Sequence, residues 1–136
     1  MTPNNLKLLG ASLYLCEGTK ARKYDSGRKY YAIEMTNTDP RIIRIFMSFL
    51  REIIDCVENR VKAEMFIYPD LNEERVIAYW SNITRIPKSR FNKSIVLNGK
   101  TKFKTSPFGT IKIRYTHKEH FLRLQGIIDK VFGGVG

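Results

Sequence analysis

The chain has little cysteine and histidine, the side chains that most often build zinc sites and nucleophilic active sites. Its 136 residues include two cysteines, Cys16 and Cys56, and two histidines, His117 and His120. The cysteines lack CxxC spacing, and no acid or cysteine cluster completes a zinc site with the histidines. A phosphate-binding loop and a GxSxG motif are also absent. These absences exclude the common zinc, nucleotide-binding and serine hydrolase motifs, and we expect both cysteines to be buried free thiols.

Long hydrophobic runs are missing as well. No stretch approaches the roughly 20 apolar residues that span a bilayer. Residues 6–16 also lack the basic start and the small-residue cleavage pattern of a secretory signal. We therefore expect an intracellular protein of the cytoplasm or of an organelle, without a membrane partner. A length of 136 residues with 43% hydrophobic residues is typical of one globular domain, here 1–136.

Acidic residues are scarce, and one long segment has none. Lys and Arg total 24 against 13 Asp and Glu, which gives a formal net charge of +11. Between Arg75 and Lys118 there is no acid, and the eleven basic residues there equal the whole net charge. A second basic cluster lies in 20–29, where Asp25 is the one acid. A surface built only for solubility intersperses both signs, whereas a field of one sign favours a polyanion such as nucleic acid.

Periodicity and turn residues predict alternating helices and strands. Helices are typical where apolar residues recur every three or four positions, and strands where they alternate. Asp39 and Pro40 predict a helix start. The expected elements are helix 6–17, a hairpin within 20–36, helix 40–57, strand 60–68, helix 73–84, strands 94–97 and 110–115, and helix 117–132. This α+β order, α-ββ-α-β-α-β-β-α, predicts a twisted antiparallel sheet with helices on one face and charged side chains on the other.

The first helix is apolar on almost every side until it ends at Glu17. Such a helix must be buried on more than one side. A carboxylate at its end is costly unless a metal or a second catalytic group pairs with it. The segment Gly10–Gly18, GASLYLCEG, resembles the LAGLIDADG motif of homing endonucleases. Aligned on the final acid and glycine, Ser12 and Cys16 fall on the small-residue positions of the motif, and Leu15 stands where the family often has an earlier acid.

The resemblance covers most of the chain, because a polar-faced hairpin and a helix–strand alternation follow the motif. Single-motif members of the family are homodimers whose motif helices pack at a two-fold axis. Leu8, Ser12 and Cys16 would then form the dimer interface, and Glu17 of each copy would be catalytic near the centre of the DNA site. The resemblance also implies Mg²⁺ or another divalent cation, bound by Glu17 and the backbone carbonyl of Cys16. The leucines that would then face the chain's own core are Leu6, Leu9 and Leu13.

Strand parity and loop position indicate which residues face DNA. Side chains on the non-core side of the predicted strands can read base edges, and loop lysines can bind phosphate. The resemblance also implies a catalytic basic residue near the scissile phosphate, for which Lys20, Lys93 and Lys112 are the candidates. The predicted DNA-binding residues are Arg22, Arg28, Tyr30, Glu34, Lys62, Glu64, Lys100, Lys102, Lys104 and Arg114.

The sequence therefore predicts a metal-dependent, sequence-specific double-stranded DNA endonuclease. It would act as a homodimer on a roughly palindromic site, because a two-fold protein matches a two-fold site. Two other hypotheses stay open. One is a DNA-binding regulator on the same fold without cleavage. The other is an RNA-binding or splicing cofactor in which Tyr30, Phe66 and Tyr68 stack exposed bases.

Overall fold

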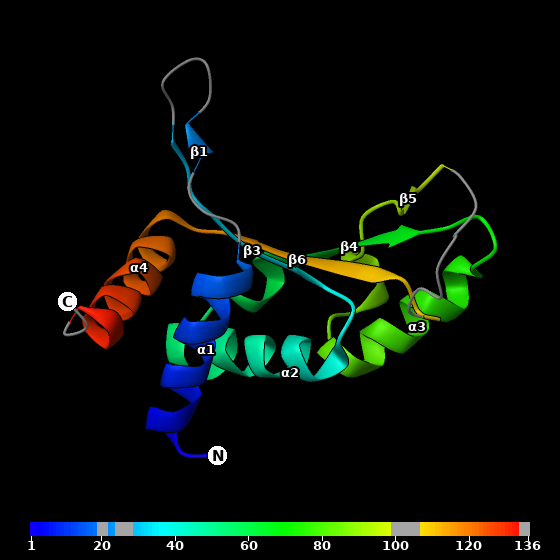
Figure 1. Cartoon of the computed structure of the whole chain (residues 1–136). Coiled ribbons are helices and arrows are strands. Elements are labelled where there is room, and N and C mark those ends of the chain that lie inside the picture. The colour runs from blue at the N-terminus through cyan, green and yellow to red at the C-terminus, as the bar shows by residue number, and fades with distance from the viewer. Residues whose placement is uncertain (19–21, 24–28, 99–106, 134–136) are drawn as a thin grey trace.

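The computed structural model describes residues 1–18, 22–23, 29–98 and 107–133, with the backbone alone at 22–23 and 29–30. It is an α+β protein in which helices lie beneath a mixed four-stranded sheet (Figure 1). The helices are α1 (Pro3–Glu17), α2 (Pro40–Phe49), α3 (Glu73–Thr84) and α4 (Lys118–Phe132), with a π turn η1 (Leu50–Ile54) and 3-10 turns η2 (Glu58–Arg60) and η3 (Lys88–Arg90). The strands are β1 (Arg22–Lys23), β2 (Lys29–Tyr30), β3 (Ala32–Asn37), β4 (Val61–Ile67), β5 (Ile95–Val96) and β6 (Thr110–Thr116).

Strand β6 lies inside the four-stranded sheet, whose order is β3-β6-β4-β5. It pairs antiparallel with β3 on one side and with β4 on the other. β5 joins the edge parallel to β4, so the sheet is mixed where the sequence predicts an antiparallel one. The reason is the connection: β5 follows β4 through α3, and a crossover of this length returns the chain in the same direction. β1 and β2 form a separate two-stranded pair above the sheet in Figure 1.

Odd-numbered residues of the long strands point into the core between the sheet and the helices. Phe46, Phe49 and Trp80 cover this face from α2 and α3, and each is 0% exposed. Burial of each such side chain contributes about 1.5–3 kcal/mol. The strand side chains that are also 0% exposed include Ile33, Met35, Val61, Met65, Ile111, Ile113 and Tyr115.

Side-chain caps start all four α-helices at defined residues. Thr2 caps α1, because its hydroxyl oxygen accepts from the backbone N–H of Asn5 at 3.2 Å. Asp39 caps α2 with Pro40 as the first helical residue, as predicted. Asn72 caps α3 in the same way. None of the helices in the described part of the chain is long and apolar enough to cross a membrane.

The second helix is shorter than the predicted 40–57. Regular α2 ends at Phe49, and the π turn η1 follows, closed by a hydrogen bond from the Cys56 N–H to the Leu50 carbonyl at 3.0 Å. Asp55 then adopts φ 59°, which ends the helix because an L-residue in the left-handed region cannot continue it. The turn redirects the chain into β4. The apolar periodicity from Ile42 to Ile53 continues through the π turn, so the periodicity does not predict that the regular helix ends at Phe49.

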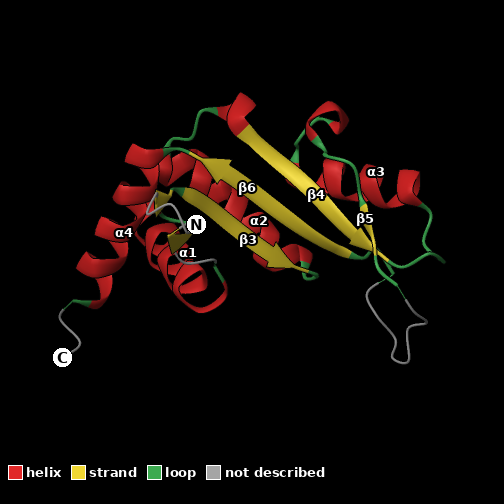
Figure 2. Ribbon diagram, turned by 90° about the horizontal axis from the view of Figure 1, so that it is seen from above, coloured by secondary structure: helices red, strands yellow, loops and turns green. Residues whose placement is uncertain are grey.

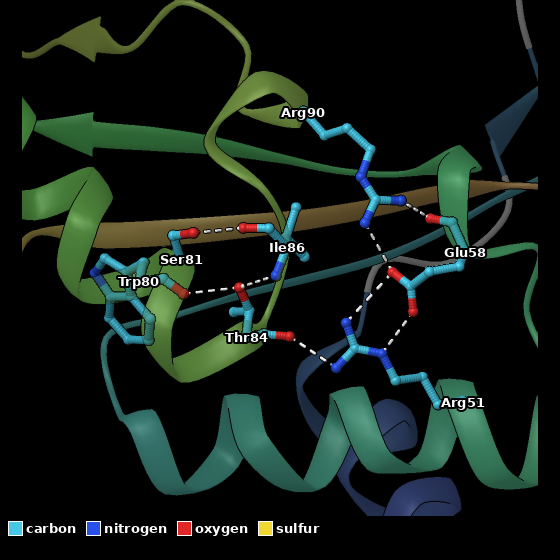
Figure 3. Close-up of polar contacts among 7 residues, drawn as sticks. All are labelled: Arg51, Glu58, Trp80, Ser81, Thr84, Ile86 and Arg90. Atoms are coloured by element: carbon cyan, nitrogen blue, oxygen red, sulfur yellow. Dashed lines mark hydrogen bonds and ion pairs between the residues drawn. The ribbon is translucent and has the colours of Figure 1, made fainter.

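A polar network holds the segment between α3 and β5 against the rest of the domain (Figure 3). The Glu58 carboxylate accepts from Arg51 at 2.7 Å and from Arg90 at 2.9 Å. Arg51 also donates to the Thr84 carbonyl at 2.7 Å, at the end of α3. Beyond η3, Asn92 donates its N–H to the Ala63 carbonyl at 2.8 Å. The network therefore fixes the chain that carries Asn92 beside β4.

Candidate nucleic-acid interface and the end of helix α1

The described helices leave one face of the four-stranded sheet in open view (Figure 2), and most side chains of this face are polar. Its side chains come from even-numbered positions. Lys62 lies opposite Arg114, and Glu64 lies opposite Lys112. Lys62 and Arg114 are exposed, and Glu64 and Lys112 are half-buried. The structure thus brings these four predicted site residues together on one face, as their strand parity predicts.

A hollow of about 500 Å³ lies at one end of this face. Three of its lining side chains are cations and none is acidic, so it suits an anionic group such as a backbone phosphate. The sequence did not point to Asn59, Arg60 or Asn92. Arg60 shares its parity with Lys62, which is a signal that the sequence does contain. The residues that line the hollow are Asn59, Arg60, Lys62, Asn92, Arg114 and Thr116.

Lys112 forms an ion pair with Glu34 on the same face. Their Nζ and Oε2 atoms are 2.8 Å apart. Glu34 is 5% exposed, so its carboxylate is held beside Lys112 and is not presented to solvent as a base-reading residue would be. An acid buried this deeply needs such a partner, because an unpaired buried charge is costly. Glu34 therefore positions the Lys112 ammonium group.

Tyr14 of α1 packs next to this pair and ties the helix to β3. Its side chain is 3% exposed and stacks on Phe46. Burial raises the pKa of Tyr14 to about 12; a hydrogen bond with the Glu34 backbone lowers it, and the Glu34 charge raises it. The hydroxyl group therefore stays neutral at physiological pH.

Glu17 is the last residue of α1 and lies where the chain joins the sheet. Gly18 forms a bridge with Met35 of β3, and its N–H donates to the Tyr14 carbonyl at 2.9 Å. A Cβ atom on Gly18 would lie 2.4 Å from the Tyr14 ring, so a side chain has no room there. Met35 in turn pairs with the residue after Lys112 in β6. Because Gly18 pairs with Met35, and Met35 pairs with the residue after Lys112, the exposed Glu17 lies at the part of the sheet that carries Lys112.

The oxygen atoms at the end of α1 are of the type that a hard divalent cation prefers. The carboxylate of Glu17 and the carbonyl of Cys16 are, however, fewer than the ligands that such a cation takes. Glu17 offers a carboxylate, and the Cys16 carbonyl lies in the last turn of the helix, where carbonyl groups generally lack a partner inside the helix. The Cys16 thiol is a soft ligand that suits Mg²⁺ poorly. Within the described residues of one copy, no three His, Cys, Asp or Glu side chains gather as a metal site. Mg²⁺ usually keeps several water ligands and binds proteins through one or two carboxylates.

Helix α1 presents several partly exposed apolar side chains. Leu8 is 51% exposed and Leu15 40% exposed, and Cys16 is exposed too. With Ser12 they share one face at helical spacing. The expectation that Cys16 is buried is therefore wrong for one copy, and Cys56 is half-buried.

The packed side of α1 differs from the predicted set. Leu9 is 39% exposed and does not face the core, whereas Tyr14 does. The reason is the close approach of Gly10 to the Phe49 ring, which turns the helix so that Ala11 and Tyr14 point inward. The residues that α1 buries are Leu6, Gly10, Ala11 and Tyr14.

Several predicted site residues lie outside this description. Arg28, Lys100, Lys102, Lys104 and Lys20 are beyond the described residues. For Arg22 and Tyr30 the backbone is described, in β1 and β2, without the side chains. Lys93 is exposed in the segment that follows η3 along β4, on the side of the sheet away from β3.

No family model, curated protein or solved structure matches this chain.

Proposed function

We propose that the protein is a sequence-specific DNA endonuclease of the LAGLIDADG kind, which binds duplex DNA on the open face of its sheet. The observation that carries this proposal is the meeting of two features. Lys62, Lys112 and Arg114 share the open face. Glu17 ends the motif-like helix beside β3, which is the neighbour of β6, the strand that carries Lys112. A surface with several cations favours DNA, and an acid near it could bind the metal ion that phosphodiester hydrolysis uses. The proposal places the protein in an intracellular compartment that holds DNA.

The proposed active unit is a homodimer. The exposed face of α1, with Leu8, Ser12, Leu15 and Cys16, is the surface that a second copy would cover. Pairing of two α1 helices about a two-fold axis brings both Glu17 residues together and makes the two sheets one continuous DNA-binding surface. The matching target is a roughly palindromic duplex site.

The residues at the end of α1 would hold a divalent cation, preferably Mg²⁺, between the two copies. When bound, the ion polarises the scissile phosphate and activates water. Glu17 and the Cys16 carbonyl would bind this ion and hold it in position at the end of α1. Lys112 is the basic residue that best suits a role beside the scissile phosphate. Its strand β6 is the neighbour of β3, to which Gly18 is bridged, whereas Lys93 lies beyond β4.

Cleavage of a randomised duplex library with Mg²⁺ tests the activity. Selected sites are recovered, and a single substrate is then cut by the parent chain and by Glu17→Gln. We expect Glu17→Gln to bind the duplex with unchanged affinity and to lose cleavage. Glu52→Gln, an exposed acid in η1, is the matched control and should cut like the parent. If Glu17→Gln cuts as fast as the parent, Glu17 is not catalytic.

The same assay separates the other functions. Site-specific duplex binding without cleavage by the parent chain would support a DNA-binding regulator. Tighter binding to structured RNA than to duplex DNA at equal salt would support the RNA-binding cofactor, in which half-buried Phe66 on the open face would stack a base. Affinities must be compared at the same ionic strength, because phosphate contacts make all of them salt-dependent.

A further inference from the structure

Both histidines of the chain meet where β6 passes into α4. His117 and His120 stack with their ring centroids 3.8 Å apart. His120 is 9% exposed, and its Nδ1 atom lies 2.6 Å from the hydroxyl oxygen of Tyr115, the buried residue before Thr116 at the end of β6. The two imidazole side chains therefore lie together at one joint of the fold.

The hydrogen bonds define which nitrogen carries the proton. The Tyr115 oxygen accepts from the Val57 N–H at 2.9 Å, and the described residues offer its hydroxyl hydrogen one acceptor, His120 Nδ1. With the Tyr115 hydroxyl as the donor in this pair, Nδ1 is unprotonated and the His120 ring is neutral. His117 is also an acceptor: its Nδ1 takes the backbone N–H of His120 at 3.1 Å and caps α4. Both contacts need a bare Nδ1 atom.

These contacts help to attach α4 to the sheet. Other attachments include Phe121, which packs edge-on against Tyr31, the buried Leu124, and Arg123, which donates to the Ile54 carbonyl at 2.6 Å. Helix α4 also packs against α1. The Tyr115 hydroxyl thus joins three segments: β6, the start of α4 and the chain after η1.

We propose that Tyr115 and His120 form a proton-sensitive latch that holds α4 against the sheet and weakens in mildly acidic solution. Protonation puts a hydrogen on His120 Nδ1, which leaves the Tyr115 hydroxyl hydrogen without an acceptor. It also places a cation at the N-terminal end of α4, where the helix dipole disfavours it.

The surrounding charges favour the neutral ring. Burial lowers the pKa of His120 the most, His117 and Arg123 lower it further, and Asp55 and Glu119 raise it by less. The undocked helix has a solvated His120, which binds its proton more readily. Undocking therefore takes up a proton, and the ratio of undocked to docked α4 rises by up to tenfold per pH unit below about 6.5. The charged or titratable groups around the latch are Asp55, Cys56, Arg60, His117, Glu119 and Arg123.

Hydrogen exchange of the full-length chain between pH 7.5 and 5.0, corrected for intrinsic rates, tests the latch. We expect protection of α4 amides to fall as the pH drops, while β4 amides keep theirs. His120→Asn is the matched variant, because its side-chain oxygen still accepts from Tyr115 and does not titrate; its α4 protection should not depend on pH. An equal pH dependence in parent and variant, or an equal loss of protection in α4 and β4, would overturn the proposal.

A second measurement does not depend on the variant folding. Imidazole ¹⁵N shifts of the parent chain report the tautomer directly. We expect His120 to show a bare Nδ1 and a protonated Nε2 at pH 7.5. A ring that carries its proton on Nδ1, or one that is charged at pH 7.5, would contradict the latch.

Discussion

The Lys112 ammonium group and the Glu34 carboxylate lie 2.8 Å apart, with Glu34 almost completely buried and Lys112 partly accessible. Two oppositely charged groups on adjacent strands thus share one face. The buried Glu34 carboxylate depends on Lys112 for a compensating positive charge. The open face is therefore less uniformly basic than its sequence, because Glu34 neutralises one of its lysines.

Lys112→Met should destabilise the fold by more than the loss of a partly accessible surface charge would. The change leaves the Glu34 carboxylate buried without a cation, which we expect to lower the free energy of unfolding by about 3 kcal/mol. Adding Glu34→Gln should recover more than half of this loss. Urea unfolding of the two single variants and the double variant measures the coupling. Additive losses would show that the pair is not coupled.

Arg60→Ala should weaken duplex binding through lost phosphate contact. Arg60 lines the hollow on the open face, so we expect a lower affinity and a decrease of about 1 in the slope of log affinity against log salt. Arg41→Ala is the control, since Arg41 pairs with Asp39 at the start of α2, away from this face. Fluorescence anisotropy at several salt concentrations makes the comparison. If both changes act alike, the open face is not the binding surface.

Leu8→Glu should separate the proposed dimer without unfolding the chain. Leu8 is half-exposed on the free face of α1, so the change should alter the stability of one copy by no more than about 0.5 kcal/mol. Leu6→Glu buries a charge and should unfold the chain instead. Sedimentation velocity of the parent and of Leu8→Glu reports the association. A parent chain that is a monomer with duplex DNA and Mg²⁺ present would contradict the homodimer.

Two helix glycines should respond to alanine with opposite signs. A Cβ atom at Gly10 would lie 2.2 Å from the Phe49 ring, so Gly10→Ala should destabilise the fold by about 1–3 kcal/mol. Gly126 in α4 has nothing within 4 Å of that position, and Gly126→Ala should stabilise the fold by about 0.5–1 kcal/mol. Chemical denaturation measures both. A neutral Gly10→Ala would mean that α1 and α2 are not in close contact.

Glu58 should give the fold an acid-sensitive contribution. Hydrogen bonding with Arg51 lowers the pKa of Glu58 the most, burial raises it, and Arg90 lowers it further. A carboxyl group with a lowered pKa stabilises the fold above its ordinary value near 4.5, and this contribution is lost as the pH falls. Glu58→Gln should cost about 1 kcal/mol at pH 7, since the group is half-exposed, and should cost less at pH 3. Unfolding curves at both pH values test this, and an equal loss at each would contradict it.

Local patterns predicted the parts of the fold that depend on local chemistry. Alternation along the strands was enough to place Lys62, Lys112 and Arg114 on one face, and Asp39-Pro40 marked the start of α2. The hollow was not predictable, because Asn92 reaches the open face only through the network around Glu58. That network joins Arg51 and Arg90, which are far apart in the sequence.

The orientation of α1 could not be predicted from the sequence either. An apolar helix of this kind offers several faces to the core, and the contact between Gly10 and Phe49 selects one of them. Leu9 and Cys16 both lie on the exposed side, as residues seven positions apart on a helix do. The structure places Glu17 and Cys16 at the exposed end of α1, and within its described residues no three His, Cys, Asp or Glu side chains gather as a metal site.

The place of β6 in the sheet determines when the domain can form during synthesis. β3 and β4 do not pair with each other, and β6, the last strand among the described residues, is inserted between them. Until the ribosome has released residue 116, both strands keep unpaired edges of the kind that aggregate. The sheet and the DNA-binding surface proposed on it therefore assemble late, in one step, as slow non-local strand pairing.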